Sequence, residues 1–173
     1  MARHSDETTI FTRQFFTFVA IGLAIASALV GLMLVGTKSA HLRLEGAIQS
    51  VRIQPTDENS AVAIFDFRIT NPSDVPFVVR HVDVFVVDED GNRTEGMRVA
   101  EVDANRIFTY YPTLGPKYNA SLVMRDQISP HQTIDRMAAS SFPLSGERLA
   151  QRKRFVIRIE DVDGAVAEVA ESR

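Results

Sequence analysis

The sequence predicts an all-β domain, an immunoglobulin-like antiparallel β-sandwich, preceded by a single transmembrane α-helix. From residue 41 onward, short segments rich in Val, Ile, Phe and Thr alternate with clusters of Pro, Gly, Asp and Asn, which is typical of strands and turns. A parallel α/β fold would need long helical crossovers between its strands. An uncharged apolar run, 15–35, precedes this pattern. We therefore expect a polar tail over 1–14, a membrane helix over 15–36 and a β-sandwich domain over 37–173.

The apolar run 15–35 is long enough to cross a bilayer. At about 1.5 Å per residue, a helix of this length reaches roughly 30 Å, the thickness of the hydrocarbon core. A cleaved signal peptide is the alternative, but its apolar core usually has only about 7 to 15 residues and ends at an uncharged small-x-small site. Here Lys38 lies within the corresponding exit. We expect the helix to be retained as an anchor, with the membrane bilayer as a partner.

Small residues recur at four-residue spacing within this run. Gly22 pairs with Ala26 in this spacing, and Ser27 pairs with Gly31. Such spacing lets two membrane helices approach closely, so these four residues are candidate contacts with other membrane-protein subunits. The alternative is that small residues are simply common in membrane helices.

Lys and Arg residues in the short flanks of a membrane helix set its orientation, and here they nearly balance. Arg3 and Arg13 precede the run, and Lys38 and Arg43 follow it. A first hydrophobic segment behind a short tail often acts as a signal anchor. We therefore expect the domain on the extracytoplasmic side of the membrane, which is the periplasmic side in a bacterium.

Segment 61–70 shows the alternation of a strand most clearly. Phe65 and Phe67 fall on one face, and Asp66 and Arg68 fall on the other. This period of two indicates a sheet with one buried and one solvated face.

Four residues are predicted to shape turns between strands. Asn71 and Pro72 end the strand over 61–70, because proline lacks a backbone donor and holds its predecessor extended. Gly91 and Gly164 each follow acidic residues and supply the positive φ angles that hairpin connections require.

The remaining segments predict further strands and one short helix. Gly46 interrupts the first strand and is a candidate bulge. Ser129 and Pro130 resemble a helix start, and apolar residues at helical spacing follow them, although a strand over 138–144 is the alternative. Strands are expected over 41–53, 77–87, 93–99, 118–125, 155–159 and 165–169, and 102–111 is expected to be irregular.

The composition argues against several classes of function. The chain has no cysteine, which removes disulfides, thiolate catalysis and thiolate metal sites. The net charge of −3 does not indicate a nucleic-acid-binding surface. No Gly-x-Ser-x-Gly elbow and no phosphate-binding glycine loop occurs in the sequence. We therefore expect a protein that is not an enzyme, needs no cofactor and binds no nucleic acid.

The sequence also offers no strong metal site. Its four histidines are His4, His41, His81 and His131, and they show no metal-ligand spacing. The acidic turns around Gly91 and Gly164 resemble fragments of a calcium loop but lack its later glutamate and its flanking helices. A weak calcium site where these two turns meet at one end of the sandwich stays open. The basic group in 148–154 is interpreted as a solvated strand entrance, with an acidic partner or a lipid headgroup as the alternative.

Segment 61–87 resembles the LEA14-like domain (LEA type 2, WHy). It has that family's succession of an extended strand, an Asn-Pro-Ser turn at 71–73 and a following apolar strand. The Ser-Pro-His sequence at 129–131 looks like the family's later turn. The resemblance implies an immunoglobulin-like β-sandwich and a family that is often tied to membranes and to stress or desiccation tolerance. It implies no catalytic residue.

Two function classes follow from these observations. In the first, the chain is a non-enzymatic single-pass membrane protein whose β-sandwich is a structural or interaction module, as an accessory subunit of a membrane assembly. In the second, it is a membrane-anchored LEA14-like protein that protects against stress or desiccation or binds a ligand. A stable stoichiometric partner would favour the first class, and abundance that follows drying or osmotic stress would favour the second.

Overall fold

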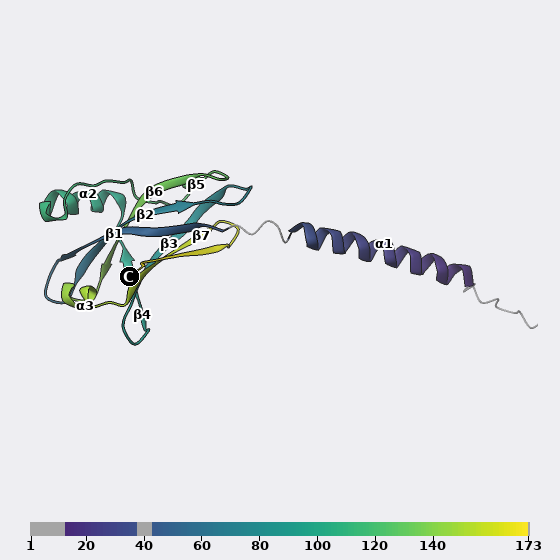
Figure 1. Cartoon of the computed structure of the whole chain (residues 1–173), viewed down its shortest axis with the longest axis horizontal. Coiled ribbons are helices and arrows are strands. Elements are labelled where there is room, and N and C mark those ends of the chain that lie inside the picture. Colours follow the sequence, from purple (N-terminus) through teal and green to yellow (C-terminus); the bar gives the residue numbers. More distant parts are fainter. Residues whose placement is uncertain (1–12, 38–42, 173) are drawn as a thin grey trace, which may run out of the picture. The chain divides into compact units, whose positions relative to one another are not determined.

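The structure is a computed structural model that describes residues 13–37 and 43–172, with side chains over 15–31 and 43–172. The chain divides into two units, Met1–Ala40 and His41–Arg173. Among the described residues, the first unit contains one helix and the second contains the strands (Figure 1).

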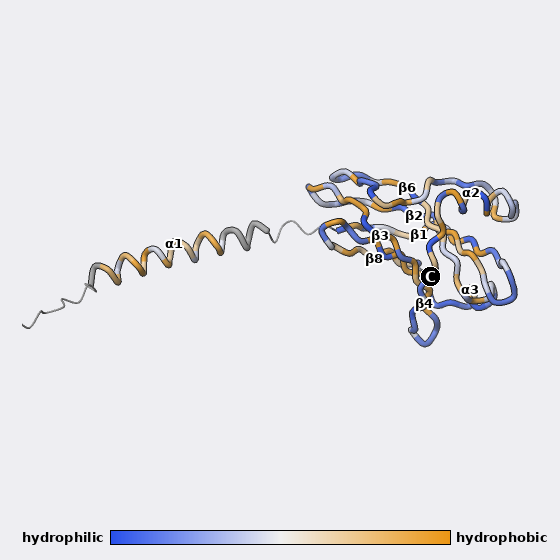
Figure 2. The backbone as a smooth tube through the Cα atoms, turned by 180° about the vertical axis from the view of Figure 1, so that it is seen from behind, coloured by the Kyte–Doolittle hydropathy of each residue, from blue (hydrophilic) through white to orange (hydrophobic). Residues whose placement is uncertain are grey.

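Helix α1 spans Arg13–Thr37, 25 residues without proline and without a charged residue after its first position. Nothing in this sequence interrupts the helical hydrogen bonds. Figure 2 shows apolar residues recurring along the helix. The exposed large apolar side chains are Phe15, Phe16, Phe18, Val19, Ile21, Leu23, Ile25, Leu29 and Val30. Within the described residues, no helix is both long and apolar enough to cross a membrane, so the predicted transmembrane span over 15–36 finds no support here.

The second unit is built from antiparallel strands. The sheet order is β1-β2-β6-β4-β3-β7-β8, and β5 pairs with β3. The strands are β1 (Glu45–Pro55), β2 (Ala61–Thr70), β3 (Phe77–Val87), β4 (Arg93–Arg98), β5 (Gln127–Ile128), β6 (Thr133–Phe142), β7 (Arg154–Asp161) and β8 (Val166–Ala170). The predicted antiparallel, mostly-β architecture is confirmed.

Strand β4 joins two layers into one sandwich, because its first residues pair with β3 and its last two pair with β6. One layer is β1-β2-β6 and the other is β3-β7-β8 (Figure 1). Gly96 lies where β4 passes from one layer to the other. A Cβ atom at Gly96 would lie 2.6 Å from the Phe142 ring, so only glycine fits this crossing without a shift.

The main core lies between the two layers. Large aromatic side chains fill it, and the rings of Phe65 and Phe155 meet edge to face with their centroids 4.7 Å apart. Phe65 and Phe67 of β2, which were expected on the buried face, point into this core, and Val84 of β3 joins them. Burial of these side chains supplies the main driving force for folding of the domain.

Two predictions of secondary structure that concern the layer β1-β2-β6 are wrong. The segment expected to be irregular forms helix α2 (Glu101–Tyr110), which is followed by a short 3-10 helix, η1 (Pro112–Leu114). The helix expected after Pro130 is instead β6. Residues 137–140 of this strand are all buried, because both of its faces are covered, so its apolar residues follow one another and mimic helical spacing.

Gly46 does not form the predicted bulge. The irregular pairing of β1 lies between Ile48 and Ser50. A Cβ atom on Gly46 would lie 2.4 Å from the backbone oxygen of Arg68. Glycine is therefore required here for the close approach of β1 to β2.

A third helix, α3 (Gly146–Ala150), follows the N-cap Ser145 and precedes β7. The basic residues behind it are only partly solvated, because Arg152 is buried. Its guanidinium donates to both carboxylate oxygens of Glu171, at 3.0 and 2.6 Å, and lies 4.3 Å from the centroid of the Phe155 ring. The interpretation of this group as a solvated strand entrance is therefore wrong for Arg152, which joins α3 to the end of the domain.

Candidate functional site

The outer face of layer β1-β2-β6 is covered by the chain between β4 and β5. We call this segment, residues 99–122, the cover. A second hydrophobic cluster forms beneath it, separate from the main core. Its buried members are Val62, Ile64, Ala104, Leu114, Met137 and Ala139, with Val99, Ile107, Phe108 and Tyr111 packed against them. The parts of β2 and β6 that lie beneath the cover are therefore buried on both faces.

Arg52 and Asp66, which pair with each other on the sheet, hold the cover through three further hydrogen bonds. The Arg52 guanidinium donates to Oδ2 of Asp66 at 2.6 Å and to the backbone oxygens of Leu114 and Pro116, both at 2.8 Å. Asn119 of the cover donates to the other oxygen of Asp66 at 2.9 Å. Asp66 was expected on a solvated face, but it is buried beneath the cover. Its charge is balanced there by the neighbouring guanidinium.

Two aromatic rings of the cover also pack near the Arg52 guanidinium. Its central carbon lies 5.1 Å from the ring centroid of Phe108 and 5.2 Å from that of Tyr118. A planar guanidinium near aromatic rings gains both cation–π attraction and apolar contact. The cover is therefore held by a charged, directional contact as well as by burial.

The first turn of α2 is fixed by a second polar network. Glu101 accepts hydrogen bonds from Nζ of Lys117 and from the backbone N–H of Ser121, and Lys117 also donates to Asn105 at 2.9 Å. Burial raises the pKa of Glu101, but the hydrogen bonds from Lys117 and Ser121 outweigh burial, and the net pKa lies below its ordinary value. Glu101 is therefore a carboxylate at neutral pH and holds both ends of the cover together.

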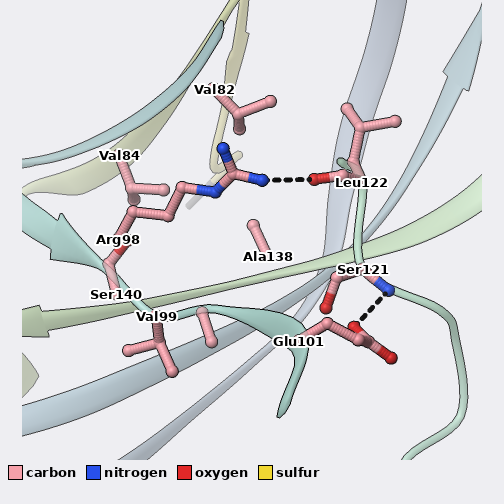
Figure 3. Close-up of a pocket in the computed structure, with 10 residues that line it drawn as sticks. Val82, Val84, Arg98, Val99, Glu101, Ser121, Leu122, Ala138 and Ser140 are labelled. Atoms are coloured by element: carbon pink, nitrogen blue, oxygen red, sulfur yellow. Dashed lines mark hydrogen bonds between the residues drawn. The ribbon is translucent and has the colours of Figure 1, made fainter. Parts of the chain in front are cut away.

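The loop 118–125 does not form the predicted strand. Its strand-like pairing, among the described residues, is one isolated parallel bridge between Ser121 and Met137. A cavity of about 10 Å³ lies beside this bridge, between β3 and β6. Figure 3 shows Arg98 reaching across this cavity toward the backbone oxygen of Leu122, 3.5 Å away. The cavity has room for about one water molecule and not for an organic ligand.

The outward side of α2 carries exposed apolar residues on a helix that is rigidly attached. We call this surface the α2 face: Val102, Asn105, Arg106, Thr109 and Tyr110, which line a shallow hollow of about 480 Å³. Val102 is 62% exposed and Tyr110 is 78% exposed. Arg106 pairs with Asp103 at 3.1 Å, within the same helix. The face therefore combines aromatic, aliphatic and polar groups on a fixed support, as protein-binding surfaces do.

The candidate helix-packing residues lie on α1, apart from this site. Gly22, Ala26 and Ser27 are exposed, and Gly31 is partly exposed. A Cβ atom at Gly22 or Gly31 would meet no atom within 4 Å. Their role in helix contacts stays a prediction.

The acidic turns lie at opposite ends of the sandwich. Gly91 and Gly164 have φ angles of 88° and 86°. The first turn follows the pair Val87 with Arg154, and the second follows the pair Val79 with Asp161. These pairs are eight residues apart along β3, or roughly 26 Å. The hypothesis of a calcium site shared by the two turns is therefore wrong.

The described histidines lie in local pairs at separate places. His81 lies 2.9 Å from Oδ1 of Asp83, and His131 lies 3.0 Å from Oδ1 of Asp74. His4 and His41 lie outside the described residues. Among the residues that the structure describes, no group of three or more metal-ligating side chains comes together.

Sequence reasoning missed the α2 face, although a signal for the helix was present. Ala104, Ile107, Phe108 and Tyr111 follow the i, i+3, i+4, i+7 spacing of a helix face. Acidic residues in the first turn, such as Glu101, are a further helix signal. The position of the cover on the sheet could not be deduced from this local pattern.

No known protein family matches the chain, and no curated protein matches it. The LEA14-like resemblance of residues 61–87 therefore finds no support in a family match. The membrane-anchored stress-protection or ligand-binding role that it implied also remains a prediction.

The solved structures that the chain matches share little sequence with it and superpose on it poorly. An ApaA-like protein from Bordetella pertussis is 14% identical over 75% of this chain and 88% of its own, with a TM-score of 0.36. The archaellum periplasmic stator complex of FlaF and FlaG from Sulfolobus acidocaldarius is 15% identical over 76% and 88%, with a TM-score of 0.34. A conserved protein from Bacillus anthracis is 11% identical over 69% and 94%, with a TM-score of 0.35. At these scores the fold assignment rests on the strand pairing of the chain itself.

Proposed function

We propose that the chain is a non-enzymatic accessory module that α1 attaches to a membrane and whose β-sandwich binds a partner protein through the α2 face. The observation that carries this proposal is the α2 face itself. Its exposed residues Val102 and Tyr110 stand on a helix that Arg52 and Glu101 fix to the sheet. A surface that is already ordered loses little conformational entropy when it binds.

The composition of α1 supports membrane attachment. The helix is 25 residues long, about 37 Å at 1.5 Å per residue, and its exposed side chains between 15 and 30 are mostly apolar. Exposed apolar surface of this extent marks a contact with lipid or protein. The predicted single-pass topology, with the domain on the extracytoplasmic side, belongs to this proposal.

The ion pairs inside the domain support a structural role over catalysis. Arg52 and Asp66, and also Arg152 and Glu171, are buried ion pairs that join segments of the fold. Lys117 and Glu101 form a third structural pair. Each of these side chains is bound to its partner and holds two segments together. None of them is positioned to act on a substrate.

The test is co-purification of the full-length tagged chain in mild detergent, with mass spectrometry of the proteins recovered in fixed ratio. The partner identified in this way is then bound to the purified chain in vitro. Replacing Val102 and Tyr110 together by Asp is expected to weaken that binding at least tenfold. The matched control is Val166→Asp, which also changes an exposed apolar residue but lies on β8.

Two results would overturn this proposal. Binding that survives the double replacement would remove the α2 face as the interface. Recovery of the chain alone would remove the accessory-subunit role. Alkaline extraction of membranes tests attachment separately, because a chain held by α1 stays in the pellet and a peripheral protein is released.

A further inference from the structure

The loops at one end of the sandwich differ in character from the turns at the other. We call the proximal end the loops 71–76, 123–126 and 162–165, which lie where the chain enters β1. The strand register places these loops at one end. Thr70, just before the loop 71–76, pairs with Glu45 at the start of β1, and Asp161, just before the loop 162–165, pairs with Val79 near the start of β3. The distal end carries the turns 56–60 and 88–92.

Exposed apolar side chains gather on the proximal end. Val75 is 37% exposed, Met124 is 60% exposed and Val162 is 49% exposed, and each lies in a different loop. The distal turns have the sequences Thr-Asp-Glu-Asn-Ser and Asp-Glu-Asp-Gly-Asn, which contain no large apolar residue. Figure 2 shows the hairpin connection beside β4 as hydrophilic. The proximal loops therefore present exposed apolar side chains, and these two distal turns present acidic ones.

Backbone hydrogen bonds hold two of the proximal loops to the first residues of β3. The N–H of Val162 donates to the backbone oxygen of Val78 at 3.0 Å, and the N–H of Arg125 donates to that of Val79 at 2.7 Å.

Asn71 connects the remaining proximal loop to the same end. It is fully buried beside Pro72, and its Nδ2 donates to the backbone oxygens of Val75 at 2.8 Å and Ile128 at 3.0 Å. The predicted turn residues Asn71 and Pro72 therefore lie in the loop that presents Val75. The three apolar side chains stand on ordered loops.

Charged residues surround this apolar group. Arg43 and Arg125 are exposed, and within the described residues neither has an ion-pair partner. Of the nearby acids, Asp74 pairs with His131, and Asp126 lies 3.8 Å from Arg136. Asp163 is exposed in the 162–165 loop. Apolar side chains beside unpaired arginines suit the boundary between lipid tails and phosphate headgroups.

Few residues of the sequence separate α1 from this end of the domain. Residues 38–42 join Thr37 to Arg43. Six Cα–Cα steps span at most about 22 Å when fully extended. If α1 is held by lipid, as the proposed function states, the end of the domain that carries Arg43 is held near the lipid surface.

We infer that the proximal end contacts the surface of the bilayer to which α1 attaches the chain. Val75, Met124 and Val162 enter the headgroup boundary, and Arg43 and Arg125 lie at the level of the lipid phosphates. This contact rests on the proposed attachment of α1. It turns the distal turns away from the membrane and so fixes the orientation of the domain.

The absence of cysteine allows a direct test in the full-length chain. Met124→Cys and the matched distal control Glu89→Cys are each labelled with an environment-sensitive NBD dye. Both proteins are reconstituted in vesicles of three parts phosphatidylcholine and one part phosphatidylglycerol. We expect the dye at 124 to shift to shorter wavelength and to be quenched by spin-labelled lipid severalfold more than the dye at 89.

Vesicle flotation separates the two proposals. A chain that floats with vesicles while both dyes report water would overturn the lipid contact and leave membrane attachment standing. A chain that does not float would overturn the attachment of α1 and with it the lipid contact. Equal circular dichroism melting curves for the two labelled proteins establish that the substitutions leave the fold intact.

Discussion

The two layers of the sandwich share one core but have different outer faces. The outer face of β1-β2-β6 is apolar and covered, with Val62 and Met137 packed under α2. The outer face of β3-β7-β8 carries a row of opposite charges, because Asp83 pairs in register with Arg158, and Arg158 with Glu168. On both layers, some of the outward-pointing residues are polar. On the covered layer those residues fasten a helix, and on the open layer they meet water.

This comparison predicts that charge removal is costly on one layer and mild on the other. Arg52→Ala leaves Asp66, whose side chain is only 6% exposed, as a buried carboxylate without its cation. Such a change typically costs about 3 to 5 kcal/mol. Urea unfolding of the full-length chain in mild detergent measures this loss of stability.

Arg68→Ala is the matched control for this prediction, since it lies on the same layer beyond the cover. Its partner Asp135 accepts at 2.8 Å, but the pair is exposed. We expect a much smaller shift in the urea midpoint. Equal shifts for Arg52→Ala and Arg68→Ala would contradict the view that the cover buries the first pair.

The second prediction concerns the apolar attachment of the cover. Leu114 is buried in the second hydrophobic cluster, so Leu114→Ala is expected to destabilise the domain by about 2 to 4 kcal/mol. Amide hydrogen exchange should become faster in α2 than in β7. Val102→Ala, on the exposed side of α2, should leave exchange unchanged. Uniform acceleration across both layers would show that the cover does not open separately.

The prediction from the sequence failed on the covered layer, at the outer face of β2. The strands over 61–70 and 77–87 were predicted with the bounds that the structure has, because turn residues such as Asn71 and Gly91 end them. The outer face of β2 was predicted to be solvated because Asp66 and Arg68 alternate with Phe65 and Phe67. That pattern describes an open face, and it cannot reveal that a distant segment covers Asp66.

The candidate site depended on the same long-range contact. The helix spacing of Ile107 and Phe108 could have located α2, but the sheet that α2 covers is set by Arg52, more than fifty residues earlier in the chain. Pairing over such a distance leaves no local signal. The strands that carry the charge row, β3, β7 and β8, were predicted from local alternation, but β3 pairs with β7 across more than sixty residues, and that pairing was not predicted either.

The third prediction is a pH dependence of the cover. The pKa of Glu101 is lowered in the fold, so its contribution to stability is present above its ordinary value of 4.5 and is lost as pH falls through the lowered pKa. Glu101→Gln should cost less than about 1 kcal/mol at pH 7, because the side chain is 37% exposed and solvent screens the pair. Unfolding curves at pH 7 and pH 3 measure this difference. A gap between the two proteins that persists unchanged at pH 3 would contradict the role of the carboxylate.

The smallest effect is expected on the open layer. Arg93 donates to Glu168 at 2.9 Å, and this contact lowers the pKa of Glu168, but both side chains are more than 40% exposed. Arg93→Ala should shift the urea midpoint only slightly at low salt. At 1 M salt, where charges are screened over about 3 Å, the shift should disappear. A large shift that persists at high salt would mean that the open face is also a packed surface, and the contrast between the two layers would fail.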